Sequence, residues 1–438
     1  MPRVQRGQAL VLGLFVLFMG TISLFFLFST GQVSADKQRV TNTADAAAYS
    51  AALWRARVLN YDAYSNRAMI ANEVAIAQTL TLASELQFNK NLAACFAMEQ
   101  GDGGTTCGAH LATIAQIIPY WTEIFEAVHA ALEYGDQAMT QIIDGEITYR
   151  SSVVNFTLSN SQTVMHTSAN FALLDGIVDQ VASANDRNFR STVLPDNFEG
   201  FTRRYTGDDR NRLANIVRRQ LDPYSRERRW NLQLGICIPP VVAFGYIYRK
   251  RGATVLSNSL DRWEAIDDLS EWRYSLRKGR CRETEEPMSW ADRNARGESD
   301  PAPTNTRDNR DAFDLSRDSA HSVRNYIGIQ PFRDLDYRNL TSGDPNVRNP
   351  RRGVAVAVSL PGNNVRTANN LNVGVGRLRM TEDFLRNRIT SVGAAEVYFR
   401  RPTPRADGRV ELPSLFNPYW QARLTEPTLA QRTLARTL

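Results

Sequence analysis

The chain has 438 residues, more than a typical small domain, and this length predicts about two to three folding units. Hydrophobic residues make up 43% and charged residues 22%, which is ordinary globular usage and excludes wholesale disorder. The net charge of +6 comes mainly from arginines interleaved with acids, as in Arg307, Asp308 and Arg310, whereas a nucleic-acid-binding protein gathers its basic residues on one stripe, so we expect no nucleic acid as a partner.

The first predicted element is an apolar helix over Ala9 to Phe28. This stretch contains no charged residue, and about 20 helical residues rising ~1.5 Å each span the ~30 Å hydrocarbon core of a bilayer. A cleaved signal peptide is the alternative, because Ser29 to Gly31 offers small residues, but the apolar core of such a peptide is usually shorter. We expect a retained transmembrane helix over residues 9–29, preceded by a cytoplasmic tail of residues 1–8.

A long helix is predicted to continue from this span. From Ser34 to Leu92 the pattern stays helical and contains no proline. Alanines recur on it every four residues, at Ala44, Ala48, Ala52 and Ala56. Small residues at this spacing let another helix approach closely, although alanine also favours a helix through its propensity alone.

Two polar residues interrupt the apolar pattern further along the same helix. Asn66 and Glu73 are seven residues apart and therefore share a face. Such groups either fix the register of packed helices or face water. We expect them to face water.

Periodicity and proline positions predict three further helices, over Leu111–Ile143, Ser151–Phe189 and Asp209–Leu221. Pro119 is expected to kink or divide the first, and Asp208 to cap the third. Together with the preceding long helix they make up a helical periplasmic region over residues 30–225.

The rest of the chain reads as a β-rich periplasmic region over residues 226–423. Strand patterns occur at Asn231–Ile238, Val241–Tyr248, Ala253–Asn258, Val354–Leu360, Asn372–Met380 and Val392–Arg400. Antiparallel pairing is the expected arrangement. The stretch Asp292–Asn349 is dense in Asp, Arg, Asn and Pro and is expected to be a mobile insertion, and residues 424–438 a flexible tail. The predicted fold class is α+β.

The four cysteines are Cys95, Cys107, Cys237 and Cys281. They form no CxxC pair, so no zinc-site spacing is present. An even number of cysteines in an exported chain suggests disulfides, and the local pairing joins Cys95 to Cys107 and Cys237 to Cys281. Four unpaired buried thiols are the alternative.

The sequence contains no GxSxG, HExxH, P-loop or GxGxxG motif. We therefore expect no catalytic residues, no cofactor and no metal site.

Five segments carry patterns of a known family: Arg6–Leu10, Val40–Ala48, Asn66–Gln78, Ala395–Pro402 and Ser414–Leu424. The first three resemble the TadE/TadG-like proteins of Tad/Flp pilus systems, in which an N-x-A-D-A-A-A patch follows the membrane span. The last two resemble a longer TadG-like subgroup with a large periplasmic part.

The resemblance implies an inner-membrane component of pilus assembly, with its C-terminal bulk in the periplasm. Its partners would be the lipid bilayer and other pilus-assembly membrane proteins or pseudopilins. One departure matters, because family pseudopilins have a peptidase-cleaved Gly and a Glu five residues later, whereas Gly7 is followed here by Gln8 and then Leu12 at the fifth position. A scaffold or anchor is therefore expected, neither a fibre subunit nor a catalyst. The alternative is a membrane-tethered periplasmic binding or adhesion module unrelated to pili.

Overall fold

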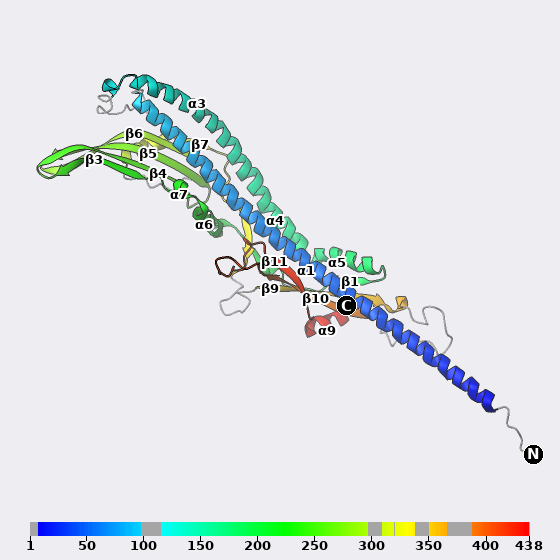
Figure 1. Ribbon diagram of the computed structural model, residues 1–438. Coiled ribbons are helices and arrows are strands. Elements are labelled where there is room, and N and C mark those ends of the chain that lie inside the picture. The colour runs from blue at the N-terminus through cyan, green and yellow to red at the C-terminus, as the bar shows by residue number, and fades with distance from the viewer. Residues whose placement is uncertain are drawn as a thin grey trace, which may run out of the picture. The chain divides into compact units, whose positions relative to one another are not determined.

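The computed structural model describes residues 8–97, 115–296, 309–318, 320–337, 350–365 and 388–437. The chain begins with the long helix α1 (Gln8–Phe96), continues with further helices and ends with mostly antiparallel sheets (Figure 1), so the predicted α+β class is confirmed. Its contacts form two compact units. Unit 1 comprises residues 1–64, 162–203 and 333–438, and unit 2 comprises residues 65–161 and 204–332. Each unit therefore combines stretches from the regions predicted as helical and as β-rich.

The other helical elements are α3 (Trp121–Thr148), the π-helix η1 (Tyr149–Asn155), α4 (Phe156–Ala169), α5 (Phe171–Asn185), η2 (Glu199–Phe201), η3 (Gly207–Arg210), α6 (Asn211–Gln220), α7 (Pro223–Arg226), α8 (Arg310–Asp318), η5 (Gly362–Asn364) and α9 (Leu429–Thr437). A turn at Pro119 precedes α3, as predicted. The predicted cap at Asp208 is wrong, because η3 precedes α6 and no side chain caps that helix.

Unit 1 is built on a four-stranded sheet in the order β1-β9-β10-β11, with all pairs antiparallel. The strands are β1 (Arg190–Val193), β9 (Arg351–Pro361), β10 (Arg388–Phe399) and β11 (Trp420–Thr425). Val354, Val356 and Val358 of β9 share a buried core with α1 and α5. Because side chains alternate along a strand, Ala355 and Ala357 face the opposite side, where they pack with Ala435 of α9.

The C-terminal residues do not form the flexible tail that was predicted. They form the end of β11 and helix α9, and Ala435 is 3% exposed. Apolar residues of α9 are widely spaced. The small apolar face of the helix is nevertheless enough to hold it on the sheet, because the facing strands carry alanines.

Unit 2 contains a five-stranded sheet in the order β3-β4-β5-β6-β7, antiparallel except for the parallel pair β6–β7. Its strands are β3 (Trp230–Ile238), β4 (Val242–Leu256), β5 (Arg262–Arg277), β6 (Arg280–Arg296) and β7 (His321–Val323). The strands predicted at Val241–Tyr248 and Ala253–Asn258 are one strand, because the residues between them pair with β5 without a break.

The region predicted as a mobile insertion, Asp292–Asn349, is largely ordered where the structure describes it. It contains the end of β6, then α8, β7 and β8 (Phe332–Leu335), which pairs with β2 (Thr202–Tyr205). Its charged residues misled the prediction because several are buried, such as Asp292 at 1% exposure and Asp334 at 0%. The strand predicted at Asn372–Met380 lies outside the described residues.

Candidate functional site

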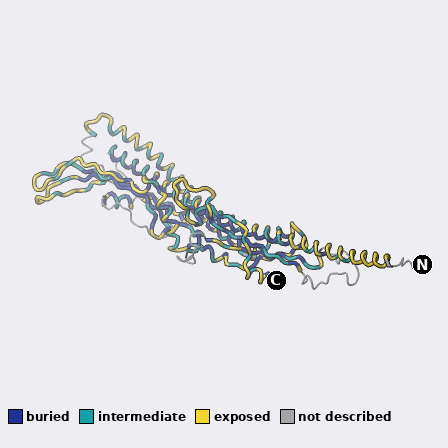
Figure 2. Tube along the Cα trace, turned by 60° about the horizontal axis from the view of Figure 1, so that its bottom comes forward, coloured by how far each residue is buried: buried dark blue, intermediate teal, exposed yellow. Residues whose placement is uncertain are grey.

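The N-terminal part of α1 exposes large apolar side chains from Leu10 to Phe28. Most of them are between 45% and 71% exposed, and Figure 2 colours this segment mainly as exposed. In the part of the chain that the structure describes, α1 is the helix long and apolar enough to cross a membrane, and its most apolar stretch is not buried against the rest of the chain. Water disfavours a continuous apolar surface of this size, so the segment is compatible with membrane anchoring.

The alanine face of α1 lies in the core of unit 1. Ala44, Ala48 and Ala52 are 0% exposed and Ala56 is 2% exposed, in one core with residues of α5, β9 and β10. The backbones come very close here, since a Cβ added to Gly393 of β10 would lie 2.2 Å from the carbonyl oxygen of Ala44. The predicted small-residue face is thus occupied by the helix and sheet of its own unit.

In unit 2, α1 is joined to the sheet by a series of side-chain hydrogen bonds with lengths of 2.6–2.8 Å. They connect Thr81 with Thr254, Ser84 with Asp267, Glu85 with Lys250, Asn91 with the carbonyl of Trp290, and the carbonyl of Phe88 with Ser289. Hydrogen bonds between buried groups are costly to break, so these contacts fix the register of the helix on the sheet.

Glu73 is an enclosed acid of α1, with 1% exposure. Its Oε2 accepts hydrogen bonds from Nε1 of Trp263 and from the hydroxyl of Tyr326, each at 2.9 Å. Its Oε1 accepts one from Nδ2 of Asn155, also at 2.9 Å. Burial raises the pKa of Glu73 to about 7, against the opposing effect of the three donors. Asn66 is 0% exposed as well, so the prediction that both residues face water is wrong.

One signal for this buried acid exists in the sequence. Glu73 is the one charged residue between Arg67 and Glu85, in an otherwise apolar and weakly polar run. Its partners Trp263 and Asn155 are far away in the chain, so the sequence could mark the acid but not its donors.

A second buried ionic group of unit 2 centres on Asp267, which is 0% exposed. Arg228 donates to it twice, from Nε to Oδ1 at 2.7 Å and from Nη2 to Oδ2 at 2.8 Å. Nζ of Lys250 lies 3.7 Å from Oδ1. Burial raises the pKa of Asp267, and Arg228 is the main influence that lowers it. Gly252 leaves room for this carboxylate, since a Cβ there would lie 2.1 Å from Oδ1.

In unit 1 three buried side chains contact one another in a row: the carboxylate of Asp62, the imidazole of His166 and the hydroxyl of Thr202. Nε2 of His166 contacts Asp62, and Nδ1 of His166 lies 3.4 Å from Oγ1 of Thr202. This order of groups is that of a catalytic triad, but the three residues are 0%, 6% and 5% exposed, so a substrate cannot reach them. The described residues contain no group of three or more His, Cys, Asp or Glu side chains that could hold a metal ion.

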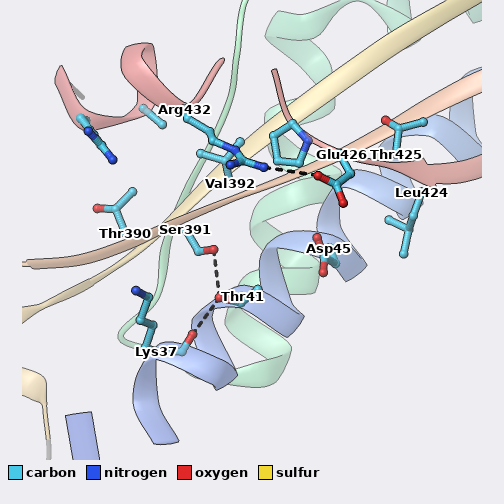
Figure 3. Close-up of a pocket in the computed structure, with 13 residues that line it drawn as sticks. Lys37, Thr41, Asp45, Thr390, Ser391, Val392, Leu424, Thr425, Glu426 and Arg432 are labelled. Carbon is cyan, nitrogen blue, oxygen red and sulfur yellow. Dashed lines mark hydrogen bonds and ion pairs between the residues drawn. The ribbon is translucent and has the colours of Figure 1, made fainter. Parts of the chain in front are cut away.

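A cavity of about 720 Å³ opens beside α1 in unit 1 (Figure 3). Oγ1 of Thr41 and Oγ of Ser391 lie 3.0 Å apart across it. At its rim Nη2 of Arg432 lies 3.6 Å from Oε2 of Glu426. The charged residues of its lining are Lys37, Asp45, Glu426, Arg432 and Arg436. Because both signs of charge are present together with hydroxyls, the cavity offers contacts to polar groups and has no arrangement specific to one reaction.

The four cysteines differ in what the structure describes. Cys237 of β3 and Cys281 of β6 form a disulfide with their Cα atoms 6.0 Å apart. Cys95 is disulfide-bonded and 5% exposed, while its predicted partner Cys107 lies outside the described residues.

Comparison with known proteins gives one match. Residues 7–56 match the family model of Flp pilus-assembly TadE/G-like proteins (Tad). The matched segment covers the exposed apolar part of α1 and the alanine face as far as Ala56. No curated protein and no solved structure matches the chain.

Proposed function

We propose that this chain is an inner-membrane-anchored component of a Tad/Flp pilus-assembly system, with a periplasmic bulk that acts as a scaffold or anchor. The observation that carries the proposal is the coincidence of the Tad match at residues 7–56 with an exposed apolar helix that runs directly into a buried core. One continuous helix thereby links a membrane-compatible segment to a folded unit.

The periplasmic side is supported by the disulfide between Cys237 and Cys281, because disulfides persist in oxidising compartments.

A stationary role is favoured over a place in the fibre by the alanine face. Faces of small residues let helices of separate chains approach closely, whereas Ala44 and Ala48 are already covered within unit 1. Leu12 stands at the position where pseudopilins have a glutamate, and this also favours a stationary role.

A scaffold is favoured over a catalyst by the position of the polar groups. Asp62 and His166 are closed to solvent, and Glu73 is surrounded by donors that hold the fold together. These groups serve the packing of α1 within each unit.

The proposal is tested by deleting the gene and counting surface pili. We expect loss of pili, restoration by the full chain, and no restoration by a chain lacking residues 9–28. Sodium carbonate washing should leave the full chain in the inner-membrane fraction. Normal piliation in a clean deletion strain would contradict the proposed function.

The second candidate is a membrane-tethered periplasmic binding or adhesion module. The polar cavity lined by Lys37, Asp45 and Arg436 is the observation in its favour. Intact pili together with lost surface attachment in the deletion strain would select this function over the first.

A further inference from the structure

The free ends of two β-hairpins in unit 2 are tied into one rigid tip. We name residues 236–244 of the β3–β4 hairpin and 276–282 of the β5–β6 hairpin the hairpin tip. The disulfide between Cys237 and Cys281 joins the two hairpins, although β3 and β6 are not neighbours in the sheet. Their turns also touch, since a Cβ added to Gly279 would lie 3.4 Å from Cβ of Pro240. The tip is therefore clamped in one conformation.

Apolar side chains of the hairpin tip face solvent. Val241 is 77% exposed, Phe244 59% and Ile238 48%. Figure 2 shows these hairpin ends largely as exposed residues. Single exposed apolar residues are ordinary, but a group of them on a clamped projection marks a surface that contacts an apolar partner.

The same tip is strongly basic. Its charged residues are Arg277, Lys278, Arg280 and Arg282, and it contains no acid. All four are exposed, and none forms an ion pair with an acid in the described part of the chain. The acid that follows on β6, Glu283, already pairs with Arg249 at 2.9 Å. The tip therefore presents a concentrated positive charge beside its apolar side chains.

The tip points along α1 toward the C-terminal end of that helix. Trp263, early in β5, bonds to Glu73 of α1. Asp267, later in β5, bonds to Ser84, later in α1. Within unit 2, β5 thus runs toward the C-terminal end of α1 and leads to Arg277.

We propose that the hairpin tip docks on the surface of an anionic phospholipid bilayer. Val241 and Phe244 would enter the boundary between headgroups and acyl chains, and the basic residues would contact lipid phosphates. Apolar insertion and attraction to anionic lipid add in such binding, and a preformed tip loses little conformational entropy. This inference goes beyond the pilus role and stands independently of it.

The test places the full chain in nanodiscs of phosphatidylcholine and offers it separate vesicles. Vesicles contain either phosphatidylcholine alone or phosphatidylcholine with phosphatidylglycerol. We expect capture of the phosphatidylglycerol vesicles, weaker capture at higher salt, and little capture of the neutral ones. Replacing Arg277, Lys278 and Arg280 by Gln should weaken capture about 100-fold, since each basic residue near an anionic surface contributes roughly fivefold.

Matched variants separate docking from general charge and folding. V241S/F244S should weaken capture at least about tenfold at any salt concentration, through lost apolar burial. Replacing Arg57, Arg187 and Arg409 by Gln removes the same charge from exposed positions of unit 1 and should leave capture unchanged. V410S/L412S removes comparable exposed apolar side chains there, at 88% and 68% exposure, and should also leave it unchanged.

Equal capture of both vesicle types, or no capture, would overturn the proposal. If the native chain captures no vesicles and the tip variants lose self-association, the tip is a protein interface instead. Retained circular dichroism and an intact disulfide between Cys237 and Cys281 show that the variants are folded.

Discussion

Helix α1 docks in the two units by different chemistry. In unit 1 its buried face is mainly small and apolar at Ala44, Ala48 and Ala52, where the β10 backbone approaches at Gly393. Beyond this alanine stretch, the buried Arg55 and Asp62 bond to Asp196 and His166. In unit 2 its buried face includes Glu73 and Ser84, which hydrogen-bond to side chains of the sheet.

The comparison shows how each kind of contact fixes the position of α1 along the sheet. Close packing of small residues is non-directional, and it tolerates a shift until side chains collide. Hydrogen bonds between buried groups are directional, and a shift leaves each partner unsatisfied. The hydrogen-bonded stretches of α1 therefore depend on its register more strongly than the alanine stretch does, and three measurements probe that contrast.

The largest expected effect is on the buried ion pair of unit 2. R228A removes both guanidinium hydrogen bonds to Asp267 and leaves that carboxylate buried, so unfolding free energy should fall by about 3–5 kcal/mol. Urea unfolding of the full chain, followed by hydrogen exchange in β5, measures this. R229A is the matched control, because Arg229 pairs with Glu227 on the surface at 47% side-chain exposure and its loss should cost less than about 1 kcal/mol. Equal effects of the two variants would show that the buried ion pair contributes no more to stability than the surface pair.

The second expected effect is a dependence of the unfolding free energy on pH, which is caused by the Glu73 carboxyl. Its folded pKa of about 7 is above the ordinary 4.5, so the folded state binds the proton more tightly than the unfolded state. The contribution of Glu73 to stability is then fully present below pH ~4.5 and decreases by on the order of 3 kcal/mol as pH rises through ~7. E73Q should remove this part of the slope.

Other buried acids also contribute to that slope, since the pKa of Asp292 is raised to about 7 as well. The expected difference is therefore about one proton between the native chain and E73Q in unfolding experiments across pH. E126Q, at an exposed position of α3, should behave like the native chain. An unchanged pH profile in E73Q would show that this carboxyl is not linked to folding.

The smallest effect concerns the alanine face of unit 1. A48L inserts a large side chain where no space remains and should cost about 1–3 kcal/mol through overpacking. A46L, two residues earlier at an exposed position, should stay within about 0.5 kcal/mol of the native chain. Thermal unfolding of both variants measures the difference, and similar values would mean that the face is not tightly packed.

The regular parts of the fold were predictable from the sequence. Strands β3, β9 and β10 follow runs of alternating or β-branched residues, and Pro239 and Pro240 form the turn after β3. The region around α8 was not predictable, because its acids and arginines read as solvent-exposed when their buried partners are unknown. Helix α9 was missed for the related reason that the sheet opposite it supplies most of the apolar contact.

By itself the sequence determined the apolar helix at Ala9–Phe28, the alanine face and the Tad resemblance, because each depends on residues close together in the chain. Only the tertiary structure decided that Glu73 is buried and that the turns at Pro240 and Gly279 form one tip. The physical reason is that burial, hydrogen bonding and disulfide contact depend on residues brought together from distant positions, and local patterns carry no record of which distant residues meet.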